Sequence, residues 1–239
     1  MDAKNQKINY IIVAHPDDET LFFASLPLSL NSEEFKIICV TDANADGHGE
    51  KRRKDFEAAC EMLGVKQTEW LGLPDVYEKR LCPKQMDSHF KKMHKELLSY
   101  KVKGFETKIF THGPIGEYMH PHHQDVSNAV INFFSEDFQV FCSSYNCHPD
   151  FQILLTKEQF ATKTKILTDI YGSETNRFVN LIPATWCEGF MKVSLAESNE
   201  IYSCLQQSTG KLDATKLSKY MWLKDFIEKK SCEQEKRLF

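Results

Sequence analysis

The sequence predicts an α/β protein with a Rossmann-like, mostly parallel sheet and helices on both faces. Short apolar runs alternate along the chain with longer segments whose apolar residues recur at helical spacing. Two loops rich in histidine and carboxylate residues, 15–19 and 111–125, each follow one of the apolar runs. Because ligands of such sheets bind outside the carboxyl ends of the strands, these loops favour the same fold and mark its candidate site.

The apolar runs predict strands at residues 8–14, 35–41, 66–73, 108–111 and 138–145. Helices are expected from Asp17 or Asp18 to Leu28, around Phe56 up to Gly64, and over 85–100, 122–134, 157–171 and 212–230. No internal repeat and no linker rich in Pro, Gly or Ser divides the chain, so one domain over 1–239 is predicted.

The composition excludes several classes of protein. The 239 residues are 41% hydrophobic, and 30 Lys+Arg against 34 Asp+Glu give a net charge of −4, so a general nucleic-acid binder is not expected. No apolar stretch approaches the roughly 20 residues that span a bilayer, and no secretory signal is recognisable. A cytoplasmic protein without an integral membrane segment is predicted. The eight cysteines contain no C-x-x-C pair and are expected to be reduced.

Four ionisable residues in five positions end the first apolar run: His15, Asp17, Asp18 and Glu19. A divalent metal would compensate their charge, since imidazole and carboxylate groups are suitable ligands. His15 and Asp18 can face one ion across the turn at Pro16, and Asp17 beside them can accept a proton from a bound water. The alternative is a helix N-cap with an acidic first turn, which explains the carboxylates but not His15.

Four of the nine histidines lie within residues 111–125. His120 and His123, one turn apart at a helix start, can present two imidazoles to one site, and a ligand from this pair would complete a His, Asp, His set. Three protein ligands with one open position are typical of catalytic zinc, which predicts hydrolysis. His112 and Glu117 are expected at the rim of the site, with plain solvent exposure as the alternative.

Other candidates have simpler alternatives. Cys142, Cys147 and His148 could hold a metal, or the cysteines could simply end a strand. Candidate aromatic residues for stacking on a sugar ring, each of which could instead belong to the core, are Trp70, Tyr77 and Trp186.

His15-Pro16-Asp17-Asp18-Glu19, together with His120-Pro121-His122-His123, resembles the signature of the PIG-L/LmbE-like de-N-acetylases. Similarity to further motifs of this family follows in chain order, at 41–47, 52–65, 71–75, 165–174 and 188–190. The resemblance covers about residues 8–190 and leaves a C-terminal helical extension at about 211–232. Met119 and His122 stand where many members have Gly and either Asp or Gln.

The resemblance implies a zinc-dependent hydrolase that removes an acetyl group from an N-acetylglucosamine-type sugar or glycoconjugate. By ligand type, Fe²⁺ or another divalent transition metal would fit two imidazoles and one carboxylate as well. It implies that the metal ligands are His15, Asp18 and His123. Asp17 is implied as the general base and His120 as the group that protonates the product or stabilises the oxyanion. The implied substrate-binding residues are Arg52, Asp75 and Tyr118.

Two other functions stay open. The same chemistry would serve a metal amidase acting on a non-sugar or thiol-conjugate amide, and the same fold could carry a non-catalytic sugar-binding module. The presence of Asp17 argues against the second, since a binding module needs no general base. The expected partner is a small N-acetylated substrate; a homo-oligomer and the identity of the final proton donor, His120 or Asp17, are left open.

Overall fold

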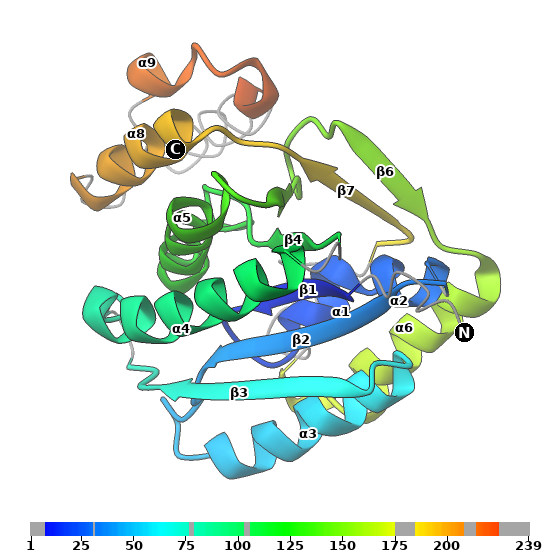
Figure 1. Cartoon of the computed structure of the whole chain (residues 1–239). Helices are drawn as coiled ribbons and strands as arrows, with labels where there is room; N and C mark the ends of the chain where they lie inside the picture. Colours follow the sequence, from blue (N-terminus) through cyan, green and yellow to red (C-terminus); the bar gives the residue numbers. More distant parts are fainter. Residues whose placement is uncertain are drawn as a thin grey trace, which may run out of the picture.

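The computed structural model describes residues 8–30, 32–76, 79–102, 106–174, 185–207 and 214–224. Its strands form one seven-stranded sheet in the order β3-β2-β1-β4-β5-β7-β6, with β3 and β6 at opposite edges (Figure 1). The strands are β1 (Ile8–Val13), β2 (Glu34–Thr41), β3 (Gln67–Leu73), β4 (Lys108–Thr111), β5 (Gln139–Ser143), β6 (Phe151–Leu154) and β7 (Cys187–Met191). β1 to β5 pair in parallel, whereas β7 runs antiparallel to both β5 and β6. The predicted mostly parallel α/β fold is confirmed.

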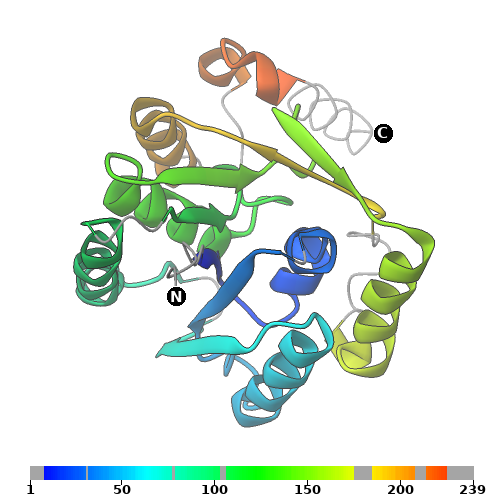
Figure 2. The ribbon, with the colours of Figure 1, turned by 45° about the vertical axis from the view of Figure 1, so that its right-hand side comes forward.

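Helices cover both faces of the sheet (Figure 2). One face packs against α1 (Asp18–Phe23), α2 (Ser25–Ser29), α3 (Gly49–Met62) and α6 (Lys157–Asp169), and the other against α4 (Pro83–Val102) and α5 (Pro121–Phe134). In β1, Ile11 and Val13 join the first core, and Tyr10 and Ile12 join the second. Successive side chains of a strand point to opposite faces, so a strand covered on both sides is apolar along most of its length, and β1 is interrupted only by Asn9, as predicted.

Three elements after β5 were not predicted from the sequence. β6 and β7 are short, β6 is largely exposed, and β7 contains Glu188 and Gly189, so neither has the apolar run that predicts a buried strand. The helix α8 (Leu195–Gln207) was also not predicted.

The predicted continuous helix at 212–230 is wrong within the described residues. There the chain forms a single turn, α9 (Ala214–Leu217), and then the 3-10 helix η1 (Met221–Leu223). Leu217, Tyr220 and Leu223, three residues apart, all enter one cluster with Ile115. A three-residue period fits a tighter turn than the α-helix, so packing explains the break. The rest of that prediction lies outside the described residues.

The strand order places a crevice beside β1. The chain proceeds from β1 to β2 and β3 on one side, and β4 and β5 lie on the other. Connections that leave in opposite directions open a crevice at the carboxyl ends of the two central strands. The loops that begin at Ala14 and at His112 therefore meet there.

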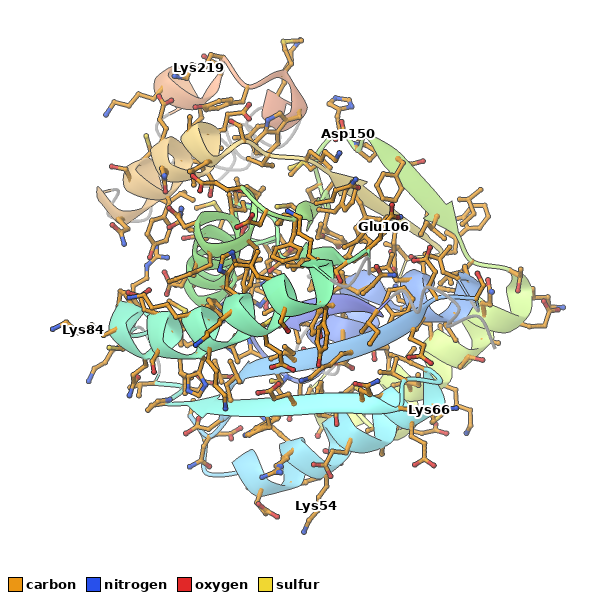
Figure 3. The ribbon with its side chains drawn as sticks, viewed as in Figure 1. Lys54, Lys66, Lys84, Glu106, Asp150 and Lys219 are labelled. Atoms are coloured by element: carbon orange, nitrogen blue, oxygen red, sulfur yellow. The ribbon has the colours of Figure 1, made fainter. Side chains whose placement is uncertain are left out.

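Charged side chains occur at the surface and also buried at this crevice. Figure 3 shows the labelled Lys54, Lys84 and Lys219 projecting away from the sheet. Buried acidic residues, in contrast, gather after β1, where Asp17, Asp18 and Glu19 are each at most 7% exposed. Among the described residues, no helix is both long and apolar enough to cross a bilayer.

Candidate active site

The turn after β1 directs its carboxylates inward. Asp17 has a φ of 94°, a conformation that non-glycine residues rarely adopt, and its side chain makes no capping hydrogen bond to α1. Asp18 Oδ2 instead accepts a hydrogen bond of 2.8 Å from the backbone N–H of His15. The N-cap alternative holds in position only: Asp17 is the N-cap residue of α1, but its side chain caps nothing, and Asp18 and Glu19 are buried rather than solvated.

Three predicted ligand residues meet at one point. His15 Nδ1 lies 3.5 Å from Asp18 Oδ2 and 3.4 Å from His123 Nε2, and His123 Nε2 lies 3.3 Å from Asp18 Oδ1. His15 follows β1, Asp18 begins α1, and His123 belongs to the first turn of α5. The fold thus brings together residues that are more than a hundred positions apart in the sequence.

His123 is supported from behind by Glu117. Its Nδ1 lies 2.7 Å from Glu117 Oε2, which leaves Nε2 as the nitrogen that faces His15 and Asp18. Glu117 Oε1 also accepts a hydrogen bond from the backbone N–H of Gly113. Although burial alone would raise the pKa of Glu117, the neighbouring imidazoles of His112 and His123 hold that pKa at about 2.

His112 completes this buried arrangement. Its Nε2 accepts a hydrogen bond of 2.9 Å from the backbone N–H of Ala14, so its Nδ1 is the donor to Glu117. Its ring stacks on His123 with centroids 3.9 Å apart. His112 and Glu117 are at most 1% exposed, so the prediction that they lie at the rim is wrong. The sequence showed four clustered histidines, but only the folded loop shows which of them lie behind a ligand.

A cavity of about 310 Å³ opens in front of these residues. The predicted site residues that line it are His15, Asp17, Arg52, Asp75, Tyr118 and His120. Asp18 and His123, at most 1% exposed, do not line the cavity but contact His15, which does. All eight predicted residues therefore gather at one site.

Asp17 and Asp18 differ in their surroundings. Burial, together with the charges of Asp18, Glu19 and Glu174, raises the pKa of Asp17 well above its ordinary value. Burial acts in the same direction on Asp18, but the imidazoles of His123 and His112 outweigh it and lower the pKa of this carboxyl. No described residue donates a hydrogen bond to the Asp17 carboxylate. One aspartate is thus suited to hold a cation and its neighbour to accept a proton.

His120 caps α5 and belongs to a group of imidazoles. Its Nδ1 accepts a hydrogen bond of 3.2 Å from the backbone N–H of His122, so the neutral ring carries its proton on Nε2. Burial and the neighbouring imidazoles of His123, His15 and His122 lower the pKa of His120. His120 is therefore a neutral hydrogen-bond donor at pH 7.

Arg52 occupies the wall of the cavity in a fixed position. Its NH2 group donates to Asp46 at 2.8 Å and to Glu174 at 2.7 Å, and its NH1 group donates to the carbonyl of Ala43. Glu174, which the family-like pattern at 165–174 contains, thus reaches the site through Arg52. Lys79 also lines the cavity and had no signal in the sequence analysis.

Other sequence candidates lie elsewhere. Among the described residues, the groups that could hold a metal all come from the loops after β1 and β4 and the first turns of α1 and α5, and none includes Cys142, Cys147 or His148. Trp70 packs against Phe56, with ring centroids 5.8 Å apart, and Trp186 is 64% exposed and does not line the cavity. Tyr77 lies outside the described residues.

The donor set fits a divalent transition metal. His15, Asp18 and His123 each offer one ligand atom, and these atoms lie within 4.8 Å of one another. Imidazole nitrogen together with carboxylate oxygen is a common ligand combination for Zn²⁺ and Fe²⁺. The fold and the site thus define a Rossmann-like α/β protein with a histidine–carboxylate centre at the switch point of its sheet.

Comparison with known proteins identifies the family. The family model for PIG-L, described as GlcNAc-PI de-N-acetylase, matches residues 10–134, which is just over half of the chain. The chain belongs to the PIG-L family.

The chain is similar to the N-acetylglucosaminyl-phosphatidylinositol de-N-acetylases of Saccharomyces cerevisiae, at 38% identity over 58 residues, and of Bos taurus, at 35% over 57 residues. These matches cover 22% and 23% of this chain but only 19% and 22% of the relatives. The structure resembles that of N,N'-diacetylchitobiose deacetylase from Pyrococcus horikoshii, with a TM-score of 0.56, 21% identity, and coverage of 82% of this chain and 88% of that one. This likeness confirms the fold.

Proposed function

We propose that the protein hydrolyses the N-acetyl amide of an N-acetylglucosamine-type sugar or glycoconjugate with the help of a divalent metal, Zn²⁺ or Fe²⁺. One observation carries the proposal: His15, Asp18 and His123 converge at one point, and His15 and Asp17 line a cavity of about 310 Å³. Membership of the PIG-L family and the names of the yeast and bovine relatives support the substrate class.

His15, Asp18 and His123 would hold the metal. When bound there, a divalent cation supplies a water of lowered pKa and polarises the amide carbonyl. Asp18 contributes the negative charge of the site, and its carboxylate stays ionised because the neighbouring imidazoles lower its pKa.

Asp17 acts as the general base. Its carboxylate lines the cavity, is free of hydrogen bonds from the described residues, and has a raised pKa. A carboxylate of raised pKa takes a proton from the attacking water more readily than an ordinary one. Removal of Asp17's charge should therefore lower turnover by at least about 100-fold without removing a ligand.

Asp17 also returns the proton to the leaving amine. The alternative donor, His120, has a lowered pKa and is neutral, so it has no proton to give readily at pH 7. Its Nε2–H group instead donates a hydrogen bond to the oxyanion of the tetrahedral intermediate. The two open roles are thus divided between Asp17, which carries the proton, and His120, which stabilises charge.

The sugar binds against the cavity wall. Arg52, Asp75 and Tyr118 line this wall and supply hydrogen-bonding groups of both kinds. The Asp75 side chain is 11% exposed, and no described residue donates a hydrogen bond to its carboxylate. This carboxylate is therefore a suitable acceptor for a sugar hydroxyl. A cytoplasmic, water-accessible sugar or headgroup is the proposed substrate.

The test combines metal analysis with acetate release. The protein is reconstituted with Zn²⁺ or Fe²⁺ and assayed on N-acetylglucosamine, its inositol and phosphatidylinositol conjugates, and short chitin oligomers. We expect near-stoichiometric metal and acetate release that is lost in Asp17→Asn. Metal without acetate from any sugar would reject the substrate class, and failure to bind metal would reject the mechanism.

A further inference from the structure

We propose that His122 is a positioning residue that fixes the tautomer of His15, so that the His15 lone pair faces the metal position. This inference rests on the proposed function, in which His15 is a ligand. His122 lies in the first turn of α5, between the predicted residues His120 and His123, and the sequence analysis gave it no role.

Two contacts of the His122 ring determine where its proton lies. His122 Nε2 is 2.7 Å from the carbonyl oxygen of Lys79, and His122 Nδ1 is 3.0 Å from His15 Nε2. A carbonyl can only accept, so Nε2 of His122 must carry the hydrogen. In the neutral ring Nδ1 is then an acceptor, and the donor in the second contact is His15 Nε2–H.

The same assignment sets the other nitrogen of His15. A neutral imidazole with its proton on Nε2 has a lone pair on Nδ1. Nδ1 is the nitrogen that lies 3.4 Å from His123 Nε2 and 3.5 Å from Asp18 Oδ2. The series of contacts from the Lys79 carbonyl through His122 therefore ends at His15 Nδ1. The lone pair of this nitrogen faces the position between His123 and Asp18 where the metal would bind.

Asp75 does not provide this support. Its Oδ2 is 3.9 Å from His15 Nε2, and its Oδ1 is 3.6 Å from His122 Nδ1, both too long for hydrogen bonds. His122 is therefore the orienting partner of His15, and Asp75 remains available to the cavity.

The Lys79 carbonyl, which accepts from His122, is itself held in place. Arg80, the residue after Lys79, donates to the carbonyl of Pro121, to Asp125 and to Gln124 at distances of 3.0, 2.9 and 2.8 Å. These contacts attach the Lys79–Arg80 segment to the first turn of α5, which also carries His122. The Lys79 carbonyl and the His122 ring are therefore held in fixed positions relative to each other.

The two imidazole ligands therefore receive different support. His123 donates to the carboxylate of Glu117, whereas His15 donates to a neutral ring that ends at a backbone carbonyl. Partners of this kind fix ring orientation, and their loss typically weakens metal binding about 10- to 100-fold.

Three substitutions test the two contacts of His122, at Nδ1 and at Nε2, one at a time. His122→Asn keeps an acceptor near the position of Nδ1, His122→Gln keeps a polar group near the position of Nε2, and His122→Phe keeps neither. The matched control is His89→Asn on α4, an exposed histidine outside the site. Each metal-free variant is titrated with Co²⁺, and the dissociation constant and the visible absorption of the bound ion are recorded.

We expect His122→Gln and His122→Phe to bind Co²⁺ about 10- to 100-fold more weakly, with His122→Asn and His89→Asn within about threefold of the unchanged protein. Equal affinity in all variants would overturn the proposal, as would retention by His122→Gln with loss in His122→Asn. Thermal unfolding of the metal-free proteins identifies a variant that fails to fold. Because Co²⁺ binding is measured without substrate, the result is independent of whether the protein releases acetate from any sugar.

Discussion

Adjacent aspartates after β1 acquire different properties from their contacts. Asp18 faces His15 and His123 and receives a backbone hydrogen bond, whereas the Asp17 carboxylate receives none from the described residues. The pKa of Asp18 is lowered and that of Asp17 is raised. Position in the sequence does not distinguish them, but the sharp turn with positive φ at Asp17 does.

This difference predicts separate effects of substitution. We expect His15→Ala and Asp18→Ala to lose stoichiometric metal, because each removes one of the three proposed ligands. Asp17→Asn should retain the metal and lose at least about 100-fold in turnover, because it removes the proposed general base. Elemental analysis and acetate release on the same preparations check both statements, and equal metal loss in all three variants would contradict the division of roles.

The lowered pKa of Glu117 leads to a second prediction at the scale of residues. Its pKa of about 2 in the fold, against an ordinary value of 4.5, corresponds to roughly 3 kcal/mol of stability above pH 4.5. Because the pKa is lowered, this stability is lost as the pH falls from about 4.5 through about 2. Glu117→Gln should therefore destabilise the metal-free protein at pH 7, and by less at about pH 3.5.

Urea unfolding of the metal-free protein at the two pH values measures the effect. Glu61→Gln, an exposed substitution on α3, is the control. A constant difference between Glu117→Gln and the unchanged protein at both pH values would show that the carboxylate contributes only through its packing.

At the scale of elements, a buried ion pair joins α6 to β7. Lys163 Nζ lies 2.6 Å from Glu188 Oε1, with side chains 0% and 2% exposed, and also donates to the carbonyl of Leu21. Glu188 Oε2 accepts from the backbone N–H of Ser25. These contacts connect α1 and α2 to α6 and to the antiparallel part of the sheet.

Breaking this pair should be costly. Lys163→Met leaves the Glu188 carboxylate buried without its cation, and we expect a loss of about 3 to 5 kcal/mol in the free energy of unfolding. The double variant Lys163→Met/Glu188→Gln should recover part of it, because no unpaired charge remains. Urea unfolding measures the two single variants, Lys163→Met and Glu188→Gln, and the double variant. If the double variant is as unstable as the sum of the two single variants, the pair does not act as a unit.

At the scale of the whole molecule, the C-terminal elements support the site loop. Leu217, Tyr220 and Leu223 pack with Ile201 of α8 against Ile115, which lies in the loop between β4 and α5. The same loop carries Glu117, Tyr118 and His120. The region beyond the family match therefore contributes to the shape of the site although it supplies no predicted site residue.

A matched pair of substitutions tests this link. Leu217→Ala and Leu97→Ala each remove a core side chain at most 1% exposed, and each should cost about 2 to 5 kcal/mol. Only Leu217→Ala should also weaken Co²⁺ binding in the folded protein, because Leu97 lies on α4 in a different core cluster. Equal Co²⁺ affinity in both variants would show that the C-terminal elements do not support the metal site.

The sequence by itself determined the order of strands and helices up to β5, because period and turn chemistry are short-range properties. Its local motifs also predicted a set of site residues, which the fold brings together. His15, Asp18 and His123 were identified by residue type and by resemblance, and the fold brings them together. The sequence could not assign His112, Glu117 and His122 their places, since a cluster of histidines does not show which ring stands behind which.

Only the tertiary structure decided those places. The tautomers of His15 and His123 depend on the Lys79 carbonyl and on Glu117, which the fold brings to the two rings. The short strands β6 and β7 and the broken helix near Leu217 were likewise decided by pairing and packing with distant elements, against weak local preferences. Local sequence predicts the candidate reactive groups, but long-range contacts orient them.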